Sequence, residues 1–530
     1  MHLFEITGGR PLRGVTTVNG SKNAALPIMA SALAMQGSAT LHEIPALTDV
    51  RTMIQLLRSV GADVTESPGA LSINADQVQK ATAAYDLVRR MRASVCVLGP
   101  LLARYGYARV ALPGGCHIGH RPIDLHLRGM SALGAVIRVQ EGYVIAEAKR
   151  LRGADISLGG PQGSTVTGTC NVMVAAALAS GRTIIRSAAC EPEVCDLGRF
   201  LNAGGAKIEG LGSPLLEIDG VEQLTGVRHT VIPDRIEAAT LAVAAAITGG
   251  EILIRNAPVG DLGSVIAALS RIGVLIRPEA AGLRVSGTRP MSSVDLVALP
   301  YPGLPTDTQA QLTALLSLVP GTSMVTDRVF PDRFRHAGEL IRMGADIRVN
   351  SGTAIIRGVS RLTGASVMAS DLRASAALVL AALAAEGTSR IRRVYHLDRG
   401  YAAFEEKLNA LGADIQRIPD SDDWIPDDHS ADTPDRPVAT DRPVHSSNCL
   451  QAAGTVNTPF ENRHRDEQTG GQSREDGMCQ VRSAAESSES PPLADTSACT
   501  YPAAAQSGEN HGRPIPAPHC RALRDVEHTR

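Results

Sequence analysis

One pattern recurs six times along the first 418 residues and constrains the fold more than any other feature of the sequence. In each copy, an apolar stretch with helical spacing ends at a glycine, and a short segment of alternating apolar and polar residues follows. The glycines lie roughly 70 residues apart, at Gly61, Gly134, Gly205, Gly273, Gly344 and Gly412. Self-similarity at a fixed period indicates one supersecondary unit that is used repeatedly.

Local physical chemistry identifies the repeated unit as a helix followed by a strand. Glycine tolerates the left-handed backbone conformation that ends many helices. Residues 62–65 and 345–349 show the two-residue period of a strand with one buried face. Four Ala-rich segments are apolar on nearly all sides, which is typical of buried helices: AALPIMASALAMQ, TCNVMVAAALASG, AATLAVAAAITGG and SAALVLAALAAEG. We therefore predict an inside-out α/β fold of two lobes, each with three βα units whose sheets cover bundled helices.

The composition changes near Pro419, where the apolar periodicity ends. Residues 420–530 contain 19 acidic residues, ten arginines and no lysine, together with many Ser, Pro and Thr residues. Such a segment buries too little apolar surface to offset the entropy of ordering, so we expect a disordered tail over residues 419–530. The sequence does not identify a partner for this tail. Because the whole chain has a net charge of −2, the body carries excess positive charge, which suits an enzyme that handles anions.

Several classes of function are disfavoured by the sequence. No Lys/Arg-rich run or basic stripe with interleaved aromatic residues is present, so we predict neither nucleic-acid nor membrane binding. The first residues do not form a signal peptide and no apolar run is long enough for a bilayer, which predicts a cytoplasmic protein. The nine cysteines lack the spacing of a zinc site, and no GxGxxG fingerprint follows a strand. We expect free thiols, no metal and no cofactor.

The segment LPGGCHIGHRPIDLHL places Cys116 in a glycine-rich stretch close to cationic groups. Arg121 lies five residues further on, and His117 and His120 are nearer still. Cationic neighbours and free backbone amides lower the pKa of a thiol and make it reactive, and glycines allow the segment to move as a lid. The alternative is a turn with an incidental cysteine.

The segment GSKNAALPIMA places Lys22 and Asn23 at the start of a buried helix. The backbone N–H groups and the dipole of a helix N-terminus favour an anion there. The upstream glycines of a Walker A loop are missing. The alternative is a helix cap followed by a solvated lysine.

The segment LPTDTQAQ places Asp307 between two threonines at a loop-to-helix junction. A carboxylate there can act as a general base if it reaches a substrate hydroxyl. The alternative is a helix cap, since Asp is favoured at that position.

A group of arginines lies at or near the starts of apolar, Ala-rich helices. The guanidinium fork binds carboxylate and phosphate groups bidentately, and burial of an unpaired arginine is costly. Asp371 and Asp398 lie beside two of these arginines in the sequence. The group consists of Arg92, Arg333, Arg373 and Arg399.

Together these segments resemble the UDP-N-acetylglucosamine 1-carboxyvinyltransferase family of enolpyruvyl transferases. The matching segments are GSKNAALPIMA, YDLVRRMRASVCVLGPLLAR, LPGGCHIGHRPIDLHL, LPTDTQAQ, VFPDRFRH, SDLRASAALVLA and YHLDRGY, in the order of the family. The resemblance covers residues 1–418 and implies two inside-out α/β barrel lobes with substrates bound between them. Lobe 1 comprises residues 21–229 with the mobile cysteine loop, and lobe 2, the catalytic lobe, comprises residues 1–20 and 230–418.

The resemblance also implies roles for individual residues. Cys116 would be the loop thiol that protonates the methylene carbon of phosphoenolpyruvate and can form a covalent pyruvyl adduct. Asp307 would be the general base at the 3-hydroxyl of UDP-N-acetylglucosamine, with Lys22 and Arg399 completing the catalytic set. The implied substrate-binding residues are Lys22, Asn23, Arg92, Arg121, Pro122, Ile123, Asp124, Leu125, Gly160, Pro161, Gln162, Asp307, Val329, Arg333, Asp371 and Arg373.

The implied reaction transfers the enolpyruvyl group and releases phosphate, as the first committed step of peptidoglycan precursor synthesis. The sequence departs from the family at His117 and His120, where small residues are more usual, and in GGPQGSTVT (residues 159–167), which lacks a frequent lysine. Two alternatives stay open. One is a shikimate-pathway enolpyruvyl transferase, which does not use a loop cysteine, and the other is an inactive paralogue that only binds a UDP-sugar.

Overall fold

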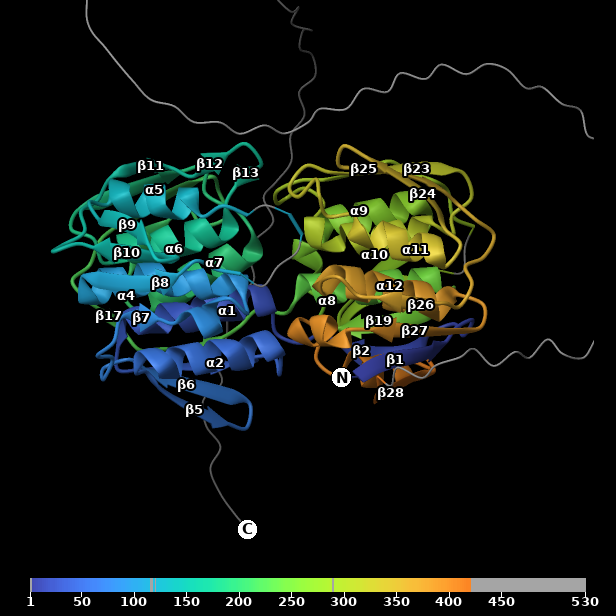
Figure 1. Cartoon of the computed structure of the whole chain (residues 1–530), viewed down its shortest axis with the longest axis horizontal. Coiled ribbons are helices and arrows are strands. Elements are labelled where there is room, and N and C mark those ends of the chain that lie inside the picture. The colour runs from blue at the N-terminus through green and yellow to red at the C-terminus, as the bar shows by residue number, and fades with distance from the viewer. Residues whose placement is uncertain (1, 115–117, 120, 288–289, 421–530) are drawn as a thin grey trace, which may run out of the picture. The chain divides into compact units, whose positions relative to one another are not determined.

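The computed structural model describes residues 2–114, 118–119, 121–287 and 290–420 (Figure 1). Residues 421–530, for which the sequence predicts disorder, lie outside the described part of the chain. Pro419, which the sequence analysis assigned to the tail, is the last residue of strand β28.

The described residues form six four-stranded sheets that share one topology. In each sheet an edge strand runs parallel to the second strand, and the third strand runs antiparallel to both of its neighbours. The first sheet of lobe 1 consists, in order, of β18 (Arg228–Thr230), β4 (Ser38–His42), β6 (Ala70–Asn74) and β5 (Asp63–Ser67). The second consists of β7 (Thr82–Ala83), β8 (Tyr107–Ala111), β10 (Tyr143–Glu147) and β9 (Val136–Gln140). The third consists of β11 (Asp155–Ser157), β14 (Arg182–Arg186), β16 (Leu215–Asp219) and β15 (Lys207–Glu209).

Lobe 2 repeats this topology three more times. Its first sheet consists, in order, of β2 (Arg13–Thr17), β19 (Glu251–Arg255), β21 (Gly282–Ser286) and β20 (Leu275–Glu279). The second consists of β22 (Leu296–Ala298), β23 (Thr322–Asp327), β25 (Thr353–Arg357) and β24 (Asp346–Asn350). The third consists of β26 (Ser366–Met368), β27 (Thr388–Arg392), β1 (His2–Thr7) and β28 (Ile415–Pro419). Lobe 1 also has two two-stranded sheets. One pairs β17 (Leu224–Thr225) with β3 (Met35–Gln36), and the other pairs β12 (Gly159–Gly160) with β13 (Gly163–Ser164).

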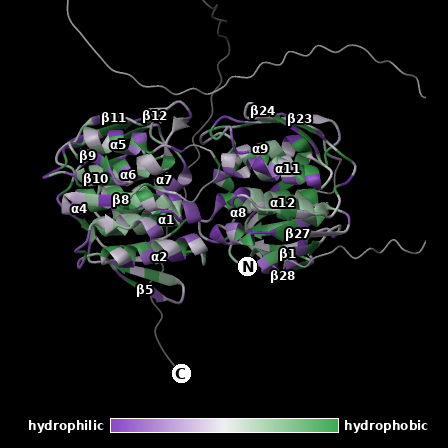
Figure 2. Cartoon of the chain, viewed as in Figure 1, coloured by the Kyte–Doolittle hydropathy of each residue, from purple (hydrophilic) through white to green (hydrophobic). Residues whose placement is uncertain are grey.

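The predicted buried helices are confirmed. Every residue of α8 (Arg235–Ile247) is buried, and α12 (Leu372–Ala384) is buried along nearly its whole length. Hydrophobic residues dominate the central helices of each lobe, while the strands lie around them (Figures 1 and 2). The other inner helices are α1 (Lys22–Ser31), α4 (Leu98–Tyr105), α6 (Val166–Ala177) and α10 (Gln309–Leu316). The remaining helices are α2 (Thr48–Val60), α3 (Tyr85–Val88), α5 (Asp124–Ala132), α7 (Pro192–Ala203), α9 (Gly263–Ile272), α11 (Arg335–Arg342) and α13 (Phe404–Asn409).

The six repeat glycines all adopt the predicted left-handed conformation. Their φ angles range from 94° to 110°, values at which a Cβ atom is strained. A strand begins two or three residues after each of them. The helix–glycine–strand unit inferred from the sequence is therefore confirmed in all six copies.

The prediction of barrel lobes is wrong in one respect, because no sheet among the described residues closes on itself. Hydrogen bonding between strands stops at the edge strands of each four-stranded sheet. Each sheet packs one face on helices, as the alternating burial along β6 and β10 shows. Among the described residues, each lobe consequently has three separate four-stranded sheets around a helical interior and not a continuous barrel.

The buried apolar side chains form two clusters, which support the proposed division into lobes. One cluster contains residues between Ala24 and Val231. The other combines residues between Phe4 and Val18 with residues between Ala238 and Ile415. The N-terminal strands β1 and β2 complete sheets of lobe 2, so the chain passes between the lobes twice.

The two passages pair with each other. Gly20 and Pro233 form an isolated antiparallel bridge, in which the Ser21 N–H donates to the Ile232 carbonyl at 2.7 Å. A Cβ atom on Gly20 would lie 1.8 Å from the carbonyl oxygen of Glu43. Only glycine fits at this crossing, because a side chain there would overlap the backbone of Glu43.

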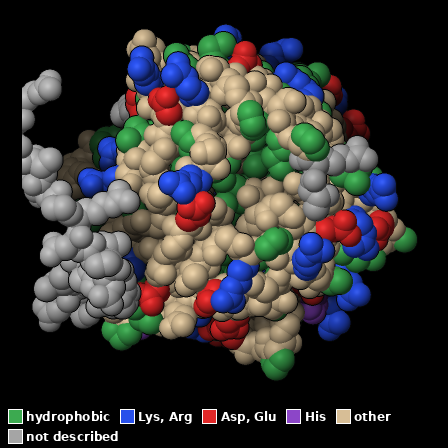
Figure 3. Space-filling model, turned by 90° about the vertical axis from the view of Figure 1, so that its right-hand side faces the viewer, with side chains coloured by type: hydrophobic (Ala, Val, Ile, Leu, Met, Phe, Trp, Pro, Cys, Tyr) green, Lys and Arg blue, Asp and Glu red, His purple; other side chains and the backbone are tan. Residues whose placement is uncertain are grey.

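Charges of both signs are mixed on the face of lobe 2 shown in Figure 3. Lys and Arg side chains lie beside Asp and Glu side chains, with hydrophobic side chains scattered among them. Exposed ion pairs such as Arg361 with Glu386 contribute little to stability, because water screens them. This face carries no large basic patch, in line with the charge pattern of the sequence.

Candidate active site

Lys22 begins α1 and keeps only a small part of its side chain exposed, so the alternative of a solvated lysine is wrong. Ser21 caps the helix by accepting the Ala24 N–H at 3.3 Å. The Lys22 side chain is 12% exposed, and its Nζ lies 3.6 Å from Asp49 Oδ2. Burial lowers the pKa of Lys22, and the attraction of Asp49 only partly offsets that effect. A buried ammonium group at a helix N-terminus is suited to bind an anion.

Asp49 joins cations from the two lobes. Its Oδ1 accepts a hydrogen bond of 2.8 Å from Arg399 Nε, while its Oδ2 faces Lys22. Arg399 lies in a 3₁₀ segment of lobe 2, Val394–Arg399. The Asp49 side chain is 5% exposed. Two cations that the sequence predicted separately therefore lie on either side of one buried carboxylate.

Asp307 is held by two arginines and does not cap a helix. Arg333 Nη1 lies 2.8 Å from Asp307 Oδ1, and Arg373 Nη2 lies 2.9 Å from Oδ2. From lobe 1, Asn23 Nδ2 approaches Oδ2 to 3.5 Å. Neither the 3₁₀ turn Thr306–Thr308 nor α10 is capped by a side chain. The cap interpretation is therefore wrong, and Asp307 is the acceptor at the centre of a cationic cluster.

The electrostatics of Asp307 follow from this setting. Burial disfavours its carboxylate, but the charges of Arg373, Arg333 and Lys22 outweigh burial and hold the pKa of Asp307 well below 3.8. Among these groups the Asp307 side chain is the most open, with 25% exposure against 1% for Arg373 and 6% for Arg333. The arrangement keeps Asp307 ionised and leaves it accessible to solvent.

Arg373 and Asp371 begin α12 with different functions. Asp371 caps the helix, because its Oδ1 accepts the N–H groups of Arg373 and Ala374 at 3.1 Å each. The Arg373 side chain passes inward, where Nη1 donates to Tyr401 Oη at 3.0 Å. Arg373 Nε has no hydrogen-bond partner among the described residues. The cap fixes the helix start, while the guanidinium lies in the interior with one N–H group that pairs with no described residue.

Arg333 follows a tight turn that also carries Val329. Its Nη1 contacts Thr306 Oγ1 at 3.1 Å in addition to Asp307. Asp327, which is 1% exposed, accepts from the Thr306 hydroxyl at 2.5 Å and from the Val329 N–H at 2.9 Å. Within the described part of the chain, Arg333 Nε also lacks a partner. The turn and the ion-pair cluster are thus connected through Thr306.

The predicted reactive thiol, Cys116, lies outside the described residues, as do Gly115, His117 and His120. The neighbouring residues of this loop contact lobe 2. A Cβ atom on Gly119 would lie 3.1 Å from Asp332 Oδ2, and the guanidinium carbon of Arg121 lies 5.1 Å from the centre of the Phe330 ring. The described ends of the loop therefore lie against the turn that precedes Arg333.

Arg92 supports the segment after the loop. Its Nη2 donates to the carbonyl oxygens of Arg121 and Pro122, the latter at 3.1 Å. Ile123 precedes α5, whose first residues are Asp124 and Leu125. Arg92 therefore acts on the backbone of the predicted nucleotide-binding stretch.

The second predicted nucleotide-binding stretch lies beside the first. A Cβ atom on Gly160 would lie 3.2 Å from Leu125 Cδ1. Arg128 of α5 donates to the Gly159 carbonyl at 3.0 Å. Pro161 and Gln162 are exposed at the turn between β12 and β13. The structure brings together two segments that are separated by 35 residues, from Leu125 to Gly160.

Comparisons with known proteins agree with this geometry. Residues 6–408 match the family model described as EPSP synthase (3-phosphoshikimate 1-carboxyvinyltransferase). A UDP-N-acetylglucosamine 1-carboxyvinyltransferase of Methylacidiphilum infernorum is 52% identical over 418 residues, which are 79% of this chain and 99% of that protein. One from Desulforapulum autotrophicum is 49% identical over 419 residues, covering 79% of this chain and 100% of that protein. The chain belongs to the UDP-N-acetylglucosamine 1-carboxyvinyltransferase family.

Solved structures place this 1-carboxyvinyltransferase family member among enolpyruvyl transferases by fold. The enolpyruvyl transferase NikO from Streptomyces tendae has a TM-score of 0.72 and 27% identity, over 78% of this chain and 98% of that one. An EPSP synthase from Acinetobacter baumannii has a TM-score of 0.61 and 19% identity, over 79% and 100% of the two chains, which shows the fold alone.

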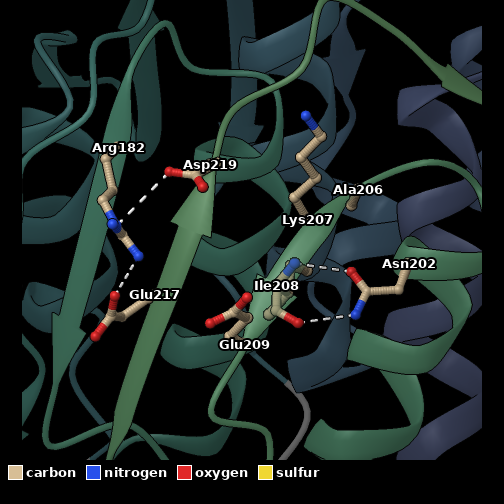
Figure 4. Close-up of a pocket in the computed structure, with 8 residues that line it drawn as sticks. All are labelled: Arg182, Asn202, Ala206, Lys207, Ile208, Glu209, Glu217 and Asp219. Carbon is tan, nitrogen blue, oxygen red and sulfur yellow. Dashed lines mark hydrogen bonds and ion pairs between the residues drawn. The ribbon is translucent and has the colours of Figure 1, made fainter.

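A surface hollow of about 300 Å³ in lobe 1 is separate from the cationic cluster around Asp49 and Asp307 (Figure 4). It lies on β14, β15 and β16, and several of its polar groups pair with one another. Arg182 bonds Glu217 and lies 3.6 Å from Asp219, and the Asn202 amide binds the backbone of Ile208. None of the predicted site residues lines this hollow.

Sequence reasoning missed several residues that shape the site of this family member. Asp49 and Asp327 each lie in short polar stretches that are equally typical of solvated turns, so no local pattern marks them. Tyr401 lies within the segment YHLDRGY, and only its closeness to Arg399 could have drawn attention to it.

In the part of the chain that the structure describes, no helix combines the length and apolar character that a bilayer crossing requires.

Proposed function

We propose that this chain transfers the enolpyruvyl group of phosphoenolpyruvate to the 3-hydroxyl of UDP-N-acetylglucosamine and releases phosphate, the first committed step of peptidoglycan precursor synthesis. One observation carries the proposal: cations from both lobes, none more than 19% exposed, meet around two carboxylates. The cations are Lys22, Arg333, Arg373 and Arg399, and the carboxylates are Asp49 and Asp307. The names of relatives at about 50% identity over nearly their whole length support the same activity.

The cations suit a small substrate with two acidic groups. Phosphoenolpyruvate carries a phosphate and a carboxylate, and guanidinium groups bind both through paired N–H donors. The Nε–H groups of Arg333 and Arg373 lack partners among the described residues. An anion that accepts these hydrogen bonds would satisfy donors that are costly to bury unpaired. Lys22 would add a further positive charge at the N-terminus of α1.

Binding of this anion would also change the basicity of Asp307. In the structure Arg333 and Arg373 hold the pKa of Asp307 well below 3.8, which makes it a weak base. A substrate anion that shares the two guanidinium groups would weaken their hold on the carboxylate and raise its pKa. Asp307 would then accept the proton of the sugar hydroxyl only when phosphoenolpyruvate is present.

The reaction proposed is an addition followed by an elimination. The sugar oxygen bonds to C2 of phosphoenolpyruvate as its proton passes to Asp307, and C3 gains a proton. In the resulting tetrahedral adduct, C3 loses a proton, the double bond re-forms and the C2–O bond to phosphate breaks. The cationic cluster stabilises the negative charge that develops on the phosphate and carboxylate.

The proton on C3 is assigned to Cys116, on the basis of the sequence resemblance. The neighbouring Gly119 and Arg121 lie against Asp332 and Phe330, just before Arg333 in the chain. This placement supports delivery of the thiol to the cationic cluster. Arg121–Leu125, Gly160–Gln162 and Val329 would hold the nucleotide sugar.

An alternative is turnover of shikimate 3-phosphate, because the matching family model is that of EPSP synthase. The loop cysteine and the names of the relatives favour the nucleotide sugar. Phosphate release tests the choice: we expect it with phosphoenolpyruvate plus UDP-N-acetylglucosamine, and not with either alone. Release with shikimate 3-phosphate in place of the nucleotide sugar would contradict the proposal. A reaction without metal or cofactor and a cytoplasmic location remain predictions from the sequence.

A further inference from the structure

Tyr401 is a buried residue beside the ion-pair cluster. Neither the sequence nor the comparison with relatives assigns a role to this tyrosine. It is 2% exposed and follows the 3₁₀ segment that contains Arg399. Its ring packs against Phe404 with 4.7 Å between ring centres, and the guanidinium carbon of Arg373 lies 5.3 Å from its centre. The tyrosine thus touches Arg373, which is 1% exposed and more deeply buried than Arg333.

The hydrogen bonds around Tyr401 have only one consistent direction. Thr240 Oγ1 lies 2.8 Å from the Ile236 carbonyl oxygen, which can only accept, so the threonine hydroxyl donates there. Thr240 therefore accepts the proton of Tyr401 Oη, 2.8 Å away. The lone pairs of the tyrosine oxygen remain free for Arg373 Nη1 at 3.0 Å. A helix carbonyl fixes the orientation of the whole chain of hydroxyl groups.

Gln311 reinforces this arrangement. Its Nε2 donates to the backbone carbonyl of Asp307 at 2.9 Å, which fixes the orientation of the amide. The same nitrogen lies 3.0 Å from Thr240 Oγ1 and 3.4 Å from Tyr401 Oη. The backbone of Asp307 and the hydroxyl that contacts Arg373 are therefore held by one side chain.

Arg373 has two hydrogen-bonding partners of different kinds among the described residues. Asp307 is charged and 25% exposed, so a substrate anion can compete with it for Nη2. The Tyr401 hydroxyl is neutral and buried, and an anion cannot replace it without leaving polar groups unpaired. The guanidinium keeps the tyrosine contact while the contact with Asp307 is exchanged.

We propose that Tyr401 is a positioning residue for Arg373. It holds one edge of the guanidinium in place, so that the other edge can pass from Asp307 to the substrate anion. The inference rests on the proposed function, because the anion is taken to be phosphoenolpyruvate. The geometry at Tyr401 itself does not depend on which acceptor substrate is used.

The test is the Tyr401→Phe variant, which keeps the ring packing and removes only the hydroxyl. Loss of a hydrogen bond to a charged group should raise the KM for phosphoenolpyruvate about tenfold and lower kcat, while the KM for UDP-N-acetylglucosamine changes less than twofold. Phe404→Leu is the packing control, with a lower melting temperature and an unchanged KM for phosphoenolpyruvate. In an Arg373→Lys background, Tyr401→Phe should have little further effect.

A Tyr401→Phe enzyme with kcat and both KM values within twofold of wild type would overturn the inference. If that variant does not fold, Thr240→Val takes its place, because it removes the acceptor that orients the tyrosine hydroxyl. It should raise the KM for phosphoenolpyruvate about threefold while Thr240→Ser stays near wild type, and an unchanged KM in Thr240→Val overturns the inference equally. Failure of the proposed function is distinguishable, because wild type would then not release phosphate from this substrate pair.

Discussion

The two lobes share one repeated fold but contribute different kinds of groups to the site. In lobe 2, Asp307 is bound by two arginines of the same lobe, and a buried hydroxyl holds one of them. In lobe 1, the segments proposed to bind the nucleotide sugar are held through their backbone carbonyls, by Arg92 and Arg128. Lobe 2 therefore supplies a preformed ionic platform of Asp307, Arg333 and Arg373, and lobe 1 supplies backbone segments together with Lys22, Asn23 and Asp49.

This difference shows how duplicated folds can divide the work of catalysis. Fixed charges act best when they need no rearrangement during the reaction, and a helical interior holds them in place. Backbone segments at a lobe edge can move with the lobe and carry a reactive loop. One charged link between the two parts is Asp49, which contacts Lys22 of lobe 1 and Arg399 of lobe 2. The buried pair of Arg235 from lobe 2 and Glu193 from lobe 1 is another.

The largest effect is expected when the platform itself is broken. Arg373→Met removes one of the two guanidinium groups paired with Asp307 and should lower kcat/KM about a hundredfold to a thousandfold. Arg361→Met is the matched control, because that arginine is 65% exposed and pairs with an exposed glutamate. Steady-state phosphate release measures both variants. A loss of less than fivefold in Arg373→Met would show that the platform is not central.

The crossing between the lobes should be the next most sensitive point. Gly20→Ala would place a Cβ atom 1.8 Å from the Glu43 carbonyl, so we expect a loss of about 3 kcal/mol or more in the free energy of unfolding. Gly338→Ala in α11 is the control, because its Cβ would meet nothing within 4 Å. Urea denaturation compares the two. Equal stability of both variants would mean that the crossing tolerates displacement.

Two carboxylates, Glu191 of lobe 1 and Asp307 of lobe 2, should respond to pH in opposite ways. Burial and the nearby Glu193 raise the pKa of Glu191, whose Oε2 has no partner among the described residues. A raised folded-state pKa gives stability that is lost as pH rises through it. Glu191→Gln should therefore stabilise the protein by about 1 kcal/mol at pH 7 and not at pH 4.

Asp307 provides the opposite case. Because its folded-state pKa is depressed, its contribution to stability is present above its unfolded pKa and lost as pH falls through the folded value. Asp307→Asn should therefore be less stable than wild type at pH 7, with a difference that shrinks in acid. Melting temperatures from pH 3 to pH 8 measure both variants, and parallel curves for the two would contradict the contrast.

The smallest effect is expected at the C-terminal end. All predicted site residues and both apolar clusters lie before residue 420, and the relatives match over about 420 residues at nearly their full length. A chain that ends after Asp420 keeps β28 complete and should retain kcat and KM within twofold. Loss of activity in this truncated chain would assign residues 421–530 a part in folding or catalysis.

Sequence patterns predicted the repeated unit well, because glycine conformation and strand alternation are local properties. They also located Lys22, Asp307 and the arginines, since unusual charges at helix starts are visible in a single sequence. The partners of these groups could not be predicted in the same way. Asp49 meets Arg399 across 350 residues of sequence, and Tyr401 meets Arg373 through a side-chain direction that only packing determines. The separate sheets also required structure, because edge-strand pairing is not a local property.

The most direct test of the central claim is intact-protein mass spectrometry after incubation with phosphoenolpyruvate and UDP-N-acetylglucosamine. The claim is that the loop thiol and the lobe 2 arginines act on the same substrate molecule. Wild type should gain one adduct, mapped by peptide analysis to Cys116, and Arg373→Met, which keeps the thiol, should gain it at least a hundredfold more slowly. An adduct that forms equally fast in Arg373→Met, or at another residue, would contradict the account.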